Sequence, residues 1–351
     1  MDGSPLETFL TGTSFFGGLP PPVVSTLASR LKERRVAAGE QLFAEGESGK
    51  SMYIVREGSL IVQRHCSDGT QAMCGGLAVR YRLTIVEQAQ QGPAAARNRA
   101  LQEASGEIVL FLDDDVVPDP ELIKEHLAVH AEDSRAVVIG PLLAPLGFEL
   151  EPWTRWEAEM LEGQYKAMAA GRWEPTPRQF YTGNASVRRG FLLEAGGFNA
   201  AFRRAEDVEL AYRLQRLKLN FYFRPEAKGW HFARRSLRSW LGVGRAYGEA
   251  DVAMYRAGLL MTLQSMAREF QWRRRPLRRM ARVFVGRPWL LRPWVGAALV
   301  GARIAELVGW RHGAEAAYSS VFNLYYWDAI SARLGGRAAF WSLIREHGSA
   351  A

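Results

Sequence analysis

The spacing of apolar and polar positions divides the chain into a β-rich start, an α/β middle and a helical end. Two short apolar runs, 52–55 and 59–62, flank the turn-like stretch Arg56-Glu57-Gly58 and predict a β-hairpin. From residue 78 onward, strand-like apolar runs alternate with helical patterns, which predicts an α/β sheet with flanking helices. Beyond residue 235 the apolar spacing is helical throughout.

The clearest strand signal runs from Glu107 to Leu112 and ends in three consecutive aspartates, Asp113, Asp114 and Asp115. Three adjacent carboxylates repel one another, and a hard divalent cation would relieve that repulsion because such cations prefer carboxylate oxygens. Open α/β sheets bind ligands at the carboxyl ends of their strands, which is where these residues fall. The alternative is a solvated acidic turn in front of the helix expected near Pro120.

Charge and cysteine content narrow the classes of partner and compartment. The 351 residues carry a formal net charge of +8, which favours anionic partners. The two cysteines, Cys66 and Cys74, have no ligand pattern around them, so neither a disulfide framework nor a zinc site is expected. The N-terminus has no basic stretch followed by an apolar run, so no secretory signal is expected. A cytoplasmic, reducing environment fits best.

Short motifs in the middle of the chain, in this order and spacing, resemble a family-2-type glycosyltransferase, an enzyme class with the nucleotide-sugar-binding GT-A fold. The motifs are Gly92 to Leu101, Ala104 to Glu107, Asp113 to Asp115, Thr182 to Arg189, Gly196 to Phe198, Ala205 to Leu210 and Gly229 to His231. The predicted fold class is therefore α/β, a GT-A-like (Rossmann-like) mixed sheet with flanking helices. A small N-terminal β-rich segment and a helical C-terminal appendage complete it.

The resemblance implies roles for individual residues. A divalent metal, Mg²⁺ or Mn²⁺, would be held by Asp115, Asp113 and His231. Residues expected to contact the nucleotide-sugar donor are Arg97, Asp113, Asp114, Gly183 and Asn184. The catalytic pair would be Asp207, as the general base that takes the proton of the acceptor hydroxyl, and Glu206 beside it. Acidic residues at a helix start are also stabilised by the helix dipole, which is the structural alternative for this pair.

The segment before residue 72 resembles the opening half of a cyclic-nucleotide-binding domain. The matching stretches are 15–19, 38–46 and 52–58. Binding a cyclic phosphate needs backbone N–H groups at a helix start and an arginine, and nothing after Arg64 supplies them. A structural or docking role is therefore favoured, and cyclic AMP is expected neither to bind nor to change activity.

The strand-helix-strand unit that normally grips the nucleobase has no counterpart before Ala78. The chain is either a fusion of two incomplete domains, or its N-terminal strands replace the missing edge of the sheet. Without a base pocket, stacking and several hydrogen bonds of about 1 kcal/mol each are lost. Weak donor affinity and little discrimination between uridine and guanosine donors are expected.

The C-terminal region is basic and amphipathic. Trp272 to Arg279 combines arginines with an aromatic side chain, and the apolar stretch from Trp289 to Trp310 is interrupted by charged residues and Pro293. The interruptions argue against a spanning helix and favour one lying at the inner face of a membrane, with a soluble helical appendage as the alternative. No nucleic-acid recognition module accompanies the basic clusters, so no nucleic-acid partner is expected. His126 and His130, four residues apart, are interpreted as ordinary helix residues and not as metal ligands.

These observations predict three segments: 1–71, partial cyclic-nucleotide-binding-like; 72–235, glycosyltransferase-like; and 236–351, basic helical. The predicted function is metal-dependent, inverting transfer of a sugar from a nucleotide-sugar to a hydroxyl of a glycan, lipid or other acceptor. Three alternatives stay open: a catalytically impaired scaffold, a cyclic-nucleotide-responsive regulator, and a nucleotidyltransferase.

Overall fold

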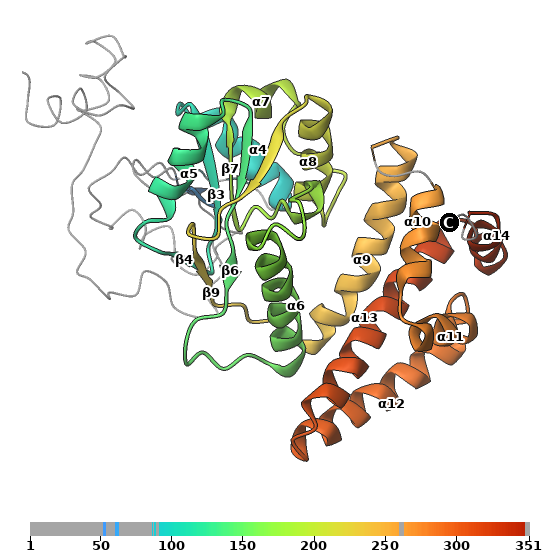
Figure 1. The fold of residues 1–351 in the computed structure, drawn as a ribbon. Helices are drawn as coiled ribbons and strands as arrows, with labels where there is room; N and C mark the ends of the chain where they lie inside the picture. The colour runs from blue at the N-terminus through green and yellow to red at the C-terminus, as the bar shows by residue number, and fades with distance from the viewer. Residues whose placement is uncertain are drawn as a thin grey trace, which may run out of the picture. The chain divides into compact units, whose positions relative to one another are not determined.

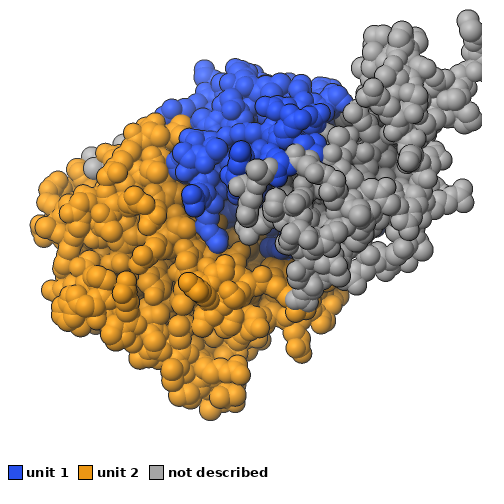
Figure 2. All heavy atoms as spheres, turned by 180° about the vertical axis from the view of Figure 1, so that it is seen from behind, with its two compact units in different colours: residues 1–142, 174–231 blue, residues 143–173, 232–351 orange. Residues whose placement is uncertain are grey.

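The computed structural model describes residues 52–53, 60–62, 86, 88, 91–259 and 263–347, with only the backbone for 52–53, 60–62 and 263–265. The chain divides into two compact units, coloured separately in Figure 2. Unit 1 comprises Met1–Leu142 and Glu174–His231, and unit 2 comprises Leu143–Trp173 and Phe232–Ala351. The segment boundaries that the sequence predicts, after residues 71 and 235, stay predictions.

Six described strands of unit 1 form a mixed sheet in the order β1-β2-β3-β7-β5-β8. Figure 1 labels its two central strands, β3 and β7. Its strands are β1 (Met52–Tyr53), β2 (Leu60–Val62), β3 (Ile108–Asp113), β5 (Ala136–Ile139), β7 (Asn184–Arg188) and β8 (Asn220–Phe223). Pairs β2–β3 and β5–β8 are parallel, whereas β1–β2, β3–β7 and β5–β7 are antiparallel. The predicted α/β class, a mixed sheet with flanking helices, is confirmed.

Helices cover both faces of this sheet. One face packs against α4 (Pro93–Glu103), α7 (Arg189–Glu194) and α8 (Glu206–Arg216), and the other against α5 (Leu122–Glu132). Strand β5, which lies between β7 and β8, is buried along its whole length, because a strand covered on both faces has no polar side. Helix α4 begins at Pro93, as a proline at a first helical position predicts.

The sequence predicts a strand from Phe180 to Val187, but the strand begins later in the structure. Pro177–Gln179 forms the 3₁₀ helix η1, and the chain then turns, with the Asn184 amide donating to the Tyr181 carbonyl at 3.1 Å. Strand β7 begins only at Asn184 because the residues just before it form that turn. The correction matters because the turn carries Gly183, a predicted site residue.

The N-terminal strands extend the sheet edge. β1 pairs with β2 in an antiparallel manner, which confirms the predicted hairpin pairing, and β2 runs parallel to β3 with Leu60 opposite Phe111. Of the two interpretations of the missing nucleobase unit, this placement agrees with N-terminal strands that replace the sheet edge. Alternating apolar residues over 79–86 predict a further strand. This strand and the other N-terminal motifs lie outside the described residues, apart from position 86.

A second sheet lies beside the acidic turn. Its strands, in the order β4-β9-β6, are β4 (Val116–Pro118), β9 (Gly229–His231) and β6 (Leu142–Leu143), where the chain passes from unit 1 to unit 2. β4 follows the Asp triplet directly and pairs with β9 in an antiparallel manner, with Val116 opposite His231. The pairing brings a residue from the end of unit 1 next to the strand-end carboxylates.

Unit 2 is helical, as predicted for the C-terminal appendage. Its helices are α6 (Pro152–Ala169), α9 (Leu237–Arg256), α10 (Leu263–Trp272), α11 (Arg275–Phe284), α12 (Pro288–Leu307), α13 (Arg311–Arg333) and α14 (Arg337–His347). Their core is rich in aromatic side chains, with Trp240 and Trp327 each 1% exposed. No described helix combines the length and apolar character that crossing a membrane requires.

Helices α9 and α13 pack closely because glycines line their contact. A Cβ atom on Gly244 would lie 2.6 Å from the Phe322 carbonyl oxygen, and one on Gly248 would lie under 3.0 Å from that of Tyr326. Only a residue without a side chain fits such a backbone approach. The tight contact places the α9 backbone against the longest described helix of the unit.

Candidate active site

The Asp triplet occupies the turn at the end of β3, where the sequence predicts it. Asp113 is the last residue of the strand, and Asp114 and Asp115 form the turn into β4. The Asp113 side chain is 38% exposed, while Asp114 and Asp115 are exposed. Three carboxylates thus stand at the carboxyl end of a buried strand, at the edge where open α/β sheets bind ligands.

Two of the three predicted metal ligands meet. The β4–β9 pairing places the His231 Nε2 atom 3.3 Å from the Asp115 Oδ2 atom. The third, Asp113, is bonded to Arg97 instead. Among the described residues, no group of three or more histidine, cysteine or acidic side chains is arranged to hold a metal ion. The structure therefore assembles a pair of candidate ligands, and not the predicted set of three.

Arg97 joins the two acidic segments of the site. From the buried face of α4 its Nη1 atom donates to Glu206 Oε1 at 2.6 Å, and its Nη2 atom donates to Asp113 Oδ1 at 3.2 Å. Its guanidinium also lies 5.6 Å from the centre of the Phe198 ring. The predicted contact of Arg97 with the donor stays a prediction. In the structure its guanidinium is bonded to two carboxylates, so it holds the site together.

Asp207 lies at the start of α8, after Ala205, which adopts a left-handed backbone with φ of 57°. The Val208 amide donates to Asp207 Oδ1 at 2.8 Å, as expected of an acidic residue at a helix start. The pKa of Asp207 is raised to about 7, first by burial and then by the charge of Glu206, while the charge of Arg97 acts in the opposite direction. A carboxylate that titrates near neutral pH is suited to accept a proton during a reaction.

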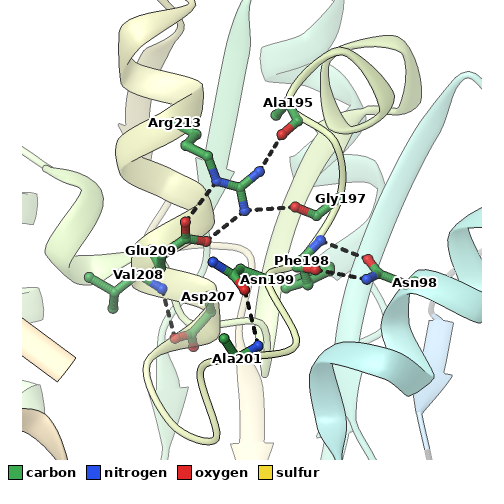
Figure 3. Close-up of polar contacts among 10 residues, drawn as sticks. All are labelled: Asn98, Ala195, Gly197, Phe198, Asn199, Ala201, Asp207, Val208, Glu209 and Arg213. Carbon is green, nitrogen blue, oxygen red and sulfur yellow. Dashed lines mark hydrogen bonds and ion pairs between the residues drawn. The ribbon is translucent and has the colours of Figure 1, made fainter. Parts of the chain in front are cut away.

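The loop before this acidic pair is fixed at two points (Figure 3). The Asn98 amide donates to the Phe198 carbonyl and accepts from the Phe198 N–H, both at 2.7 Å. Arg213 donates to the Ala195 and Gly197 carbonyls and forms an ion pair with Glu209. Sequence reasoning missed both anchors. The spacing of Glu209 and Arg213, four residues apart on a helix, was the available signal for the second.

The Gly183 backbone lies close to the Asp113 side chain, and only a residue without a side chain allows this approach. A Cβ atom at this position would be 3.0 Å from Asp113 Oδ2 and equally close to the Leu142 side chain. A side chain here would displace the carboxylate or its neighbour. The glycine thus keeps open the space next to Asp113.

The Asn184 side chain faces the protein interior, and the expected contact of this segment with the donor stays a prediction. It is 1% exposed, and its Nδ2 atom donates to the Pro141 and Ala227 carbonyls at 3.0 and 2.7 Å. Its Oδ1 atom lies 2.9 Å from His126 Nε2. All of these partners belong to the protein, so Asn184 fixes the backbone around the turn.

His126 and His130 belong to a buried hydrogen-bond chain and not to a metal site. Because Asn184 Nδ2 donates to two carbonyls, its Oδ1 atom must accept, and His126 Nε2 is the donor. His126 Nδ1 then accepts from the Ser186 hydroxyl, which accepts in turn from His130 Nε2, both at 2.8 Å. Burial lowers the pKa of each histidine to about 4, so both are neutral at pH 7. The interpretation as non-ligands agrees with this geometry, although a buried chain was not foreseen.

Part of the chain is similar to a known protein family. Residues 60–207 match the family model described as Glycosyl transferase family 2. The match begins at Leu60, the first residue of β2, and ends at Asp207. It therefore includes a strand that the sequence assigns to the N-terminal segment. A glycosyltransferase family 2 domain is supported over this part of the chain.

Similar curated proteins are also named as glycosyltransferases. A pre-mycofactocin glycosyltransferase of Mycobacterium tuberculosis is 31% identical over 163 residues, covering 45% of this chain and 34% of the relative. The uncharacterized glycosyltransferase YfnE of Bacillus subtilis is 24% identical over 220 residues, covering 49% of this chain and 56% of the relative. The chain thus spans about a third to a half of the length of the curated relatives it matches.

Solved structures of similar proteins include two with bound nucleotides. A mannosyltransferase, PcManGT from Pyrobaculum calidifontis, in complex with GDP-Man and Mn²⁺, has a TM-score of 0.43 and 18% identity, covering 75% of this chain and 76% of its own. TarS 1-349 from S. aureus, in complex with UDP, has a TM-score of 0.35 and 18% identity, covering 70% and 72%.

Proposed function

We propose that unit 1 is the catalytic domain of a glycosyltransferase that moves a sugar from a nucleotide-sugar to an acceptor hydroxyl. The observation that carries the proposal is the meeting of two acidic segments at Arg97, one from the end of β3 and one from the start of α8. Glu206 is 109 residues from Arg97 in sequence, so only the fold brings these segments together. Both lie within the stretch that matches the family.

In this proposal Asp207 is the general base. The acceptor oxygen forms a bond to the anomeric carbon while the bond from that carbon to the diphosphate oxygen breaks. The hydroxyl proton passes to the Asp207 carboxylate, and the electron pair leaves with the diphosphate. One displacement inverts the anomeric configuration. A pKa near 7 keeps a large part of Asp207 ionised at neutral pH and still basic enough to accept the proton.

Asp115 and His231 would hold a divalent cation. A carboxylate and an imidazole 3.3 Å apart are ligand types that Mn²⁺ accepts, and two protein ligands leave coordination positions for phosphate oxygens. Mg²⁺ would rely more on the carboxylate and on water. Such a cation, when bound, would neutralise charge on the leaving diphosphate. Asp114, exposed in the same turn, faces the solvent from which a donor would approach.

Weak donor affinity with little discrimination between nucleobases is also part of the proposal. It is argued from the sequence, in which no stretch before Ala78 resembles the strand-helix-strand unit that normally grips a nucleobase. Competition with free nucleoside diphosphates measures this property. Micromolar, base-selective binding would contradict it and would require a base pocket built from the N-terminal strands.

The acceptor side of the proposal includes a membrane surface. Along α12, exposed apolar side chains share one helical face: Trp289, Val300, Ile304 and Leu307. A helix with an exposed apolar face and arginines beside it suits the interface of an anionic bilayer. Ile304→Ser should weaken sedimentation with anionic vesicles, and equal sedimentation of the variant and the unaltered protein would remove α12 from the interaction.

Sugar transfer by Asp207→Asn tests the proposed chemistry. The amide keeps the size of the side chain but cannot accept the proton, so transfer should fall by roughly a hundredfold or more while donor binding persists. Glu194→Gln, an exposed acid-to-amide change on α7, is the matched control and should keep its activity. Unchanged transfer in Asp207→Asn would remove this residue from the mechanism.

A further inference from the structure

Unit 2 contains an open cavity of about 860 Å³ between α10, α11 and α14, far along the chain from the residues of the candidate active site. Its walls include Phe270, Arg278, Arg282, Arg337, Trp341 and Arg345. No acidic side chain is among the residues that line it. The volume is in the range that holds small organic ligands.

The four arginines are placed by helical spacing. Arg278 and Arg282 stand four residues apart on α11, so they share one face of that helix. Arg337 and Arg345 stand eight apart on α14, with Trp341 midway between them on the same face. Two helices therefore present cationic faces to one cavity, which is a convergent arrangement and not a general basic surface.

The hydrogen-bond acceptors of Arg278 and Arg337 are neutral groups. Arg278 Nη1 donates to the Gln271 side chain at 2.6 Å, and Arg337 donates to the carbonyls of Val285 and Arg282. These bonds hold the side chains in position without cancelling their charge. Burial, and then the charge of Arg287, lower the pKa of Arg337, as expected where positive charge is concentrated.

One wall of the cavity is aromatic. The Arg337 guanidinium lies 5.6 Å from the centre of the Trp341 ring, and the Phe270 and Trp341 rings meet edge to face at 5.7 Å. A guanidinium held over an aromatic ring has a fixed plane and fewer conformations to lose when it binds. The cavity is therefore partly organised before any ligand enters.

From this geometry we infer that the cavity is a binding site for an anion that carries phosphate groups. Guanidinium groups bind phosphate oxygens through paired, charge-assisted hydrogen bonds, and several around one cavity match a multiply charged phosphate better than a single carboxylate. The ligand is either a soluble phosphate compound or the headgroup of an anionic lipid. The site is separate from sugar transfer and does not depend on the proposed function.

The test compares two double charge reversals on the same helix. Arg278→Glu with Arg282→Glu changes the cavity wall. Arg275→Glu with Arg279→Glu is the matched control, because it makes the same change in net charge at exposed positions that do not line the cavity. Binding of inorganic pyrophosphate is measured by calorimetry in EDTA, which removes cation-dependent binding elsewhere. Binding to phosphatidylcholine vesicles with and without phosphatidic acid is measured by sedimentation.

The cavity variant should lose at least about tenfold in affinity for whichever probe binds, because it removes charged hydrogen bonds to the anion. The control should lose less than about threefold. Binding of pyrophosphate identifies a soluble phosphate as a ligand, and binding of phosphatidic acid vesicles alone identifies a lipid headgroup. Should the reversal prevent folding, judged by thermal unfolding, the exposed single changes Arg282→Gln and Arg345→Gln replace it and should each weaken binding.

Three results would overturn the inference. Equal losses in the cavity and control variants would show that overall charge alone attracts the anion. No binding of either probe by the unaltered protein would show that the arginines do not form an anion site. Stronger binding of duplex DNA than of either probe, with equal losses in both variants, would also count against it.

Discussion

Replacing Arg97 by methionine should destabilise unit 1 far more than the same change at a nearby arginine. Methionine keeps an unbranched apolar side chain and removes the charge. Glu206 would then be a nearly buried carboxylate, 8% exposed, that has lost its cationic partner. Asp113, 38% exposed, would lose a second ion pair but would still be screened by water.

The magnitude follows from these exposures. Removing one partner of a buried ion pair costs about 3–5 kcal/mol, because the remaining charge stays desolvated. The longer contact to the half-exposed Asp113 adds at most about 1 kcal/mol. Arg99 lies two residues further along α4 and pairs with Glu103, with side chains 47% and 35% exposed. Arg99→Met should therefore cost less than about 1 kcal/mol.

Urea unfolding of the two variants, followed by circular dichroism, measures the difference. Adding Glu206→Gln to the Arg97→Met protein should restore part of the lost stability, because it removes the uncompensated charge. Equal losses for Arg97→Met and Arg99→Met would refute the description of Arg97 as the buried link of the site. A double variant no more stable than Arg97→Met would refute the assignment of the cost to Glu206.

Two further predictions concern packing and pH. Gly248→Ala should lower the free energy of unfolding by about 1–3 kcal/mol, because the added methyl group meets the α13 backbone. Gly242→Ala on the same helix meets nothing within 4 Å and should be neutral or stabilising. Calorimetric melting of both variants measures the difference, and equal melting temperatures would contradict the prediction. The pKa of His126 and of His130 is about 4 in the folded protein, below the ordinary 6.5, so stability is lost as pH falls from 6.5 towards 4, by about 2 kcal/mol per histidine between pH 7 and 5. Asp207, with a raised pKa, shifts stability in the opposite direction, so a stability measurement alone would mix the two effects. NMR titration of the imidazoles measures the histidines separately. Titration of all six histidines above pH 6 would exclude the buried chain.

Much of unit 1 was predictable because its signals are local. The apolar run before Asp113 predicts β3, Pro93 predicts the start of α4, and the acidic pair at Glu206 predicts the start of α8. The aromatic run Asn220–Phe223 predicts a strand, and β8 has these bounds. Each of these features depends on residues within a few positions of one another.

The contacts that define the site were not predictable in this way. The Arg97 to Glu206 ion pair joins residues 109 apart, and the His126 to Ser186 bond joins residues 60 apart. One sequence without an alignment contains no signal that pairs such distant positions. The same limit explains why the hydrogen bonds of Asn184 were not predicted. Its motif indicates a ligand contact, while its partners in the structure lie in three other segments.

Helix α6 shows that its bounds, but not its packing partner, were predictable. Its aromatic residues predict a helix over 153–170, and the structure has Pro152–Ala169. Its place in unit 2 depends on the edge-to-face contact of Trp156 with Trp240, 5.8 Å between ring centres, which joins the middle of the chain to the C-terminal helices. Periodicity identifies the buried face of a helix but not the partner that covers it.

The central claim, that this chain transfers sugar from a nucleotide-sugar with Asp207 as base, is tested most directly by nucleoside diphosphate release. The unaltered protein, Asp207→Asn and Glu194→Gln are each incubated with Mn²⁺ and a panel of nucleotide-sugars. Water is the acceptor, and NMR follows the released sugar. We expect diphosphate release and an inverted anomer from the unaltered protein and from Glu194→Gln, with loss of roughly a hundredfold or more in Asp207→Asn. Absence of release from every donor, equal release by Asp207→Asn, or release of nucleoside monophosphate would contradict the account.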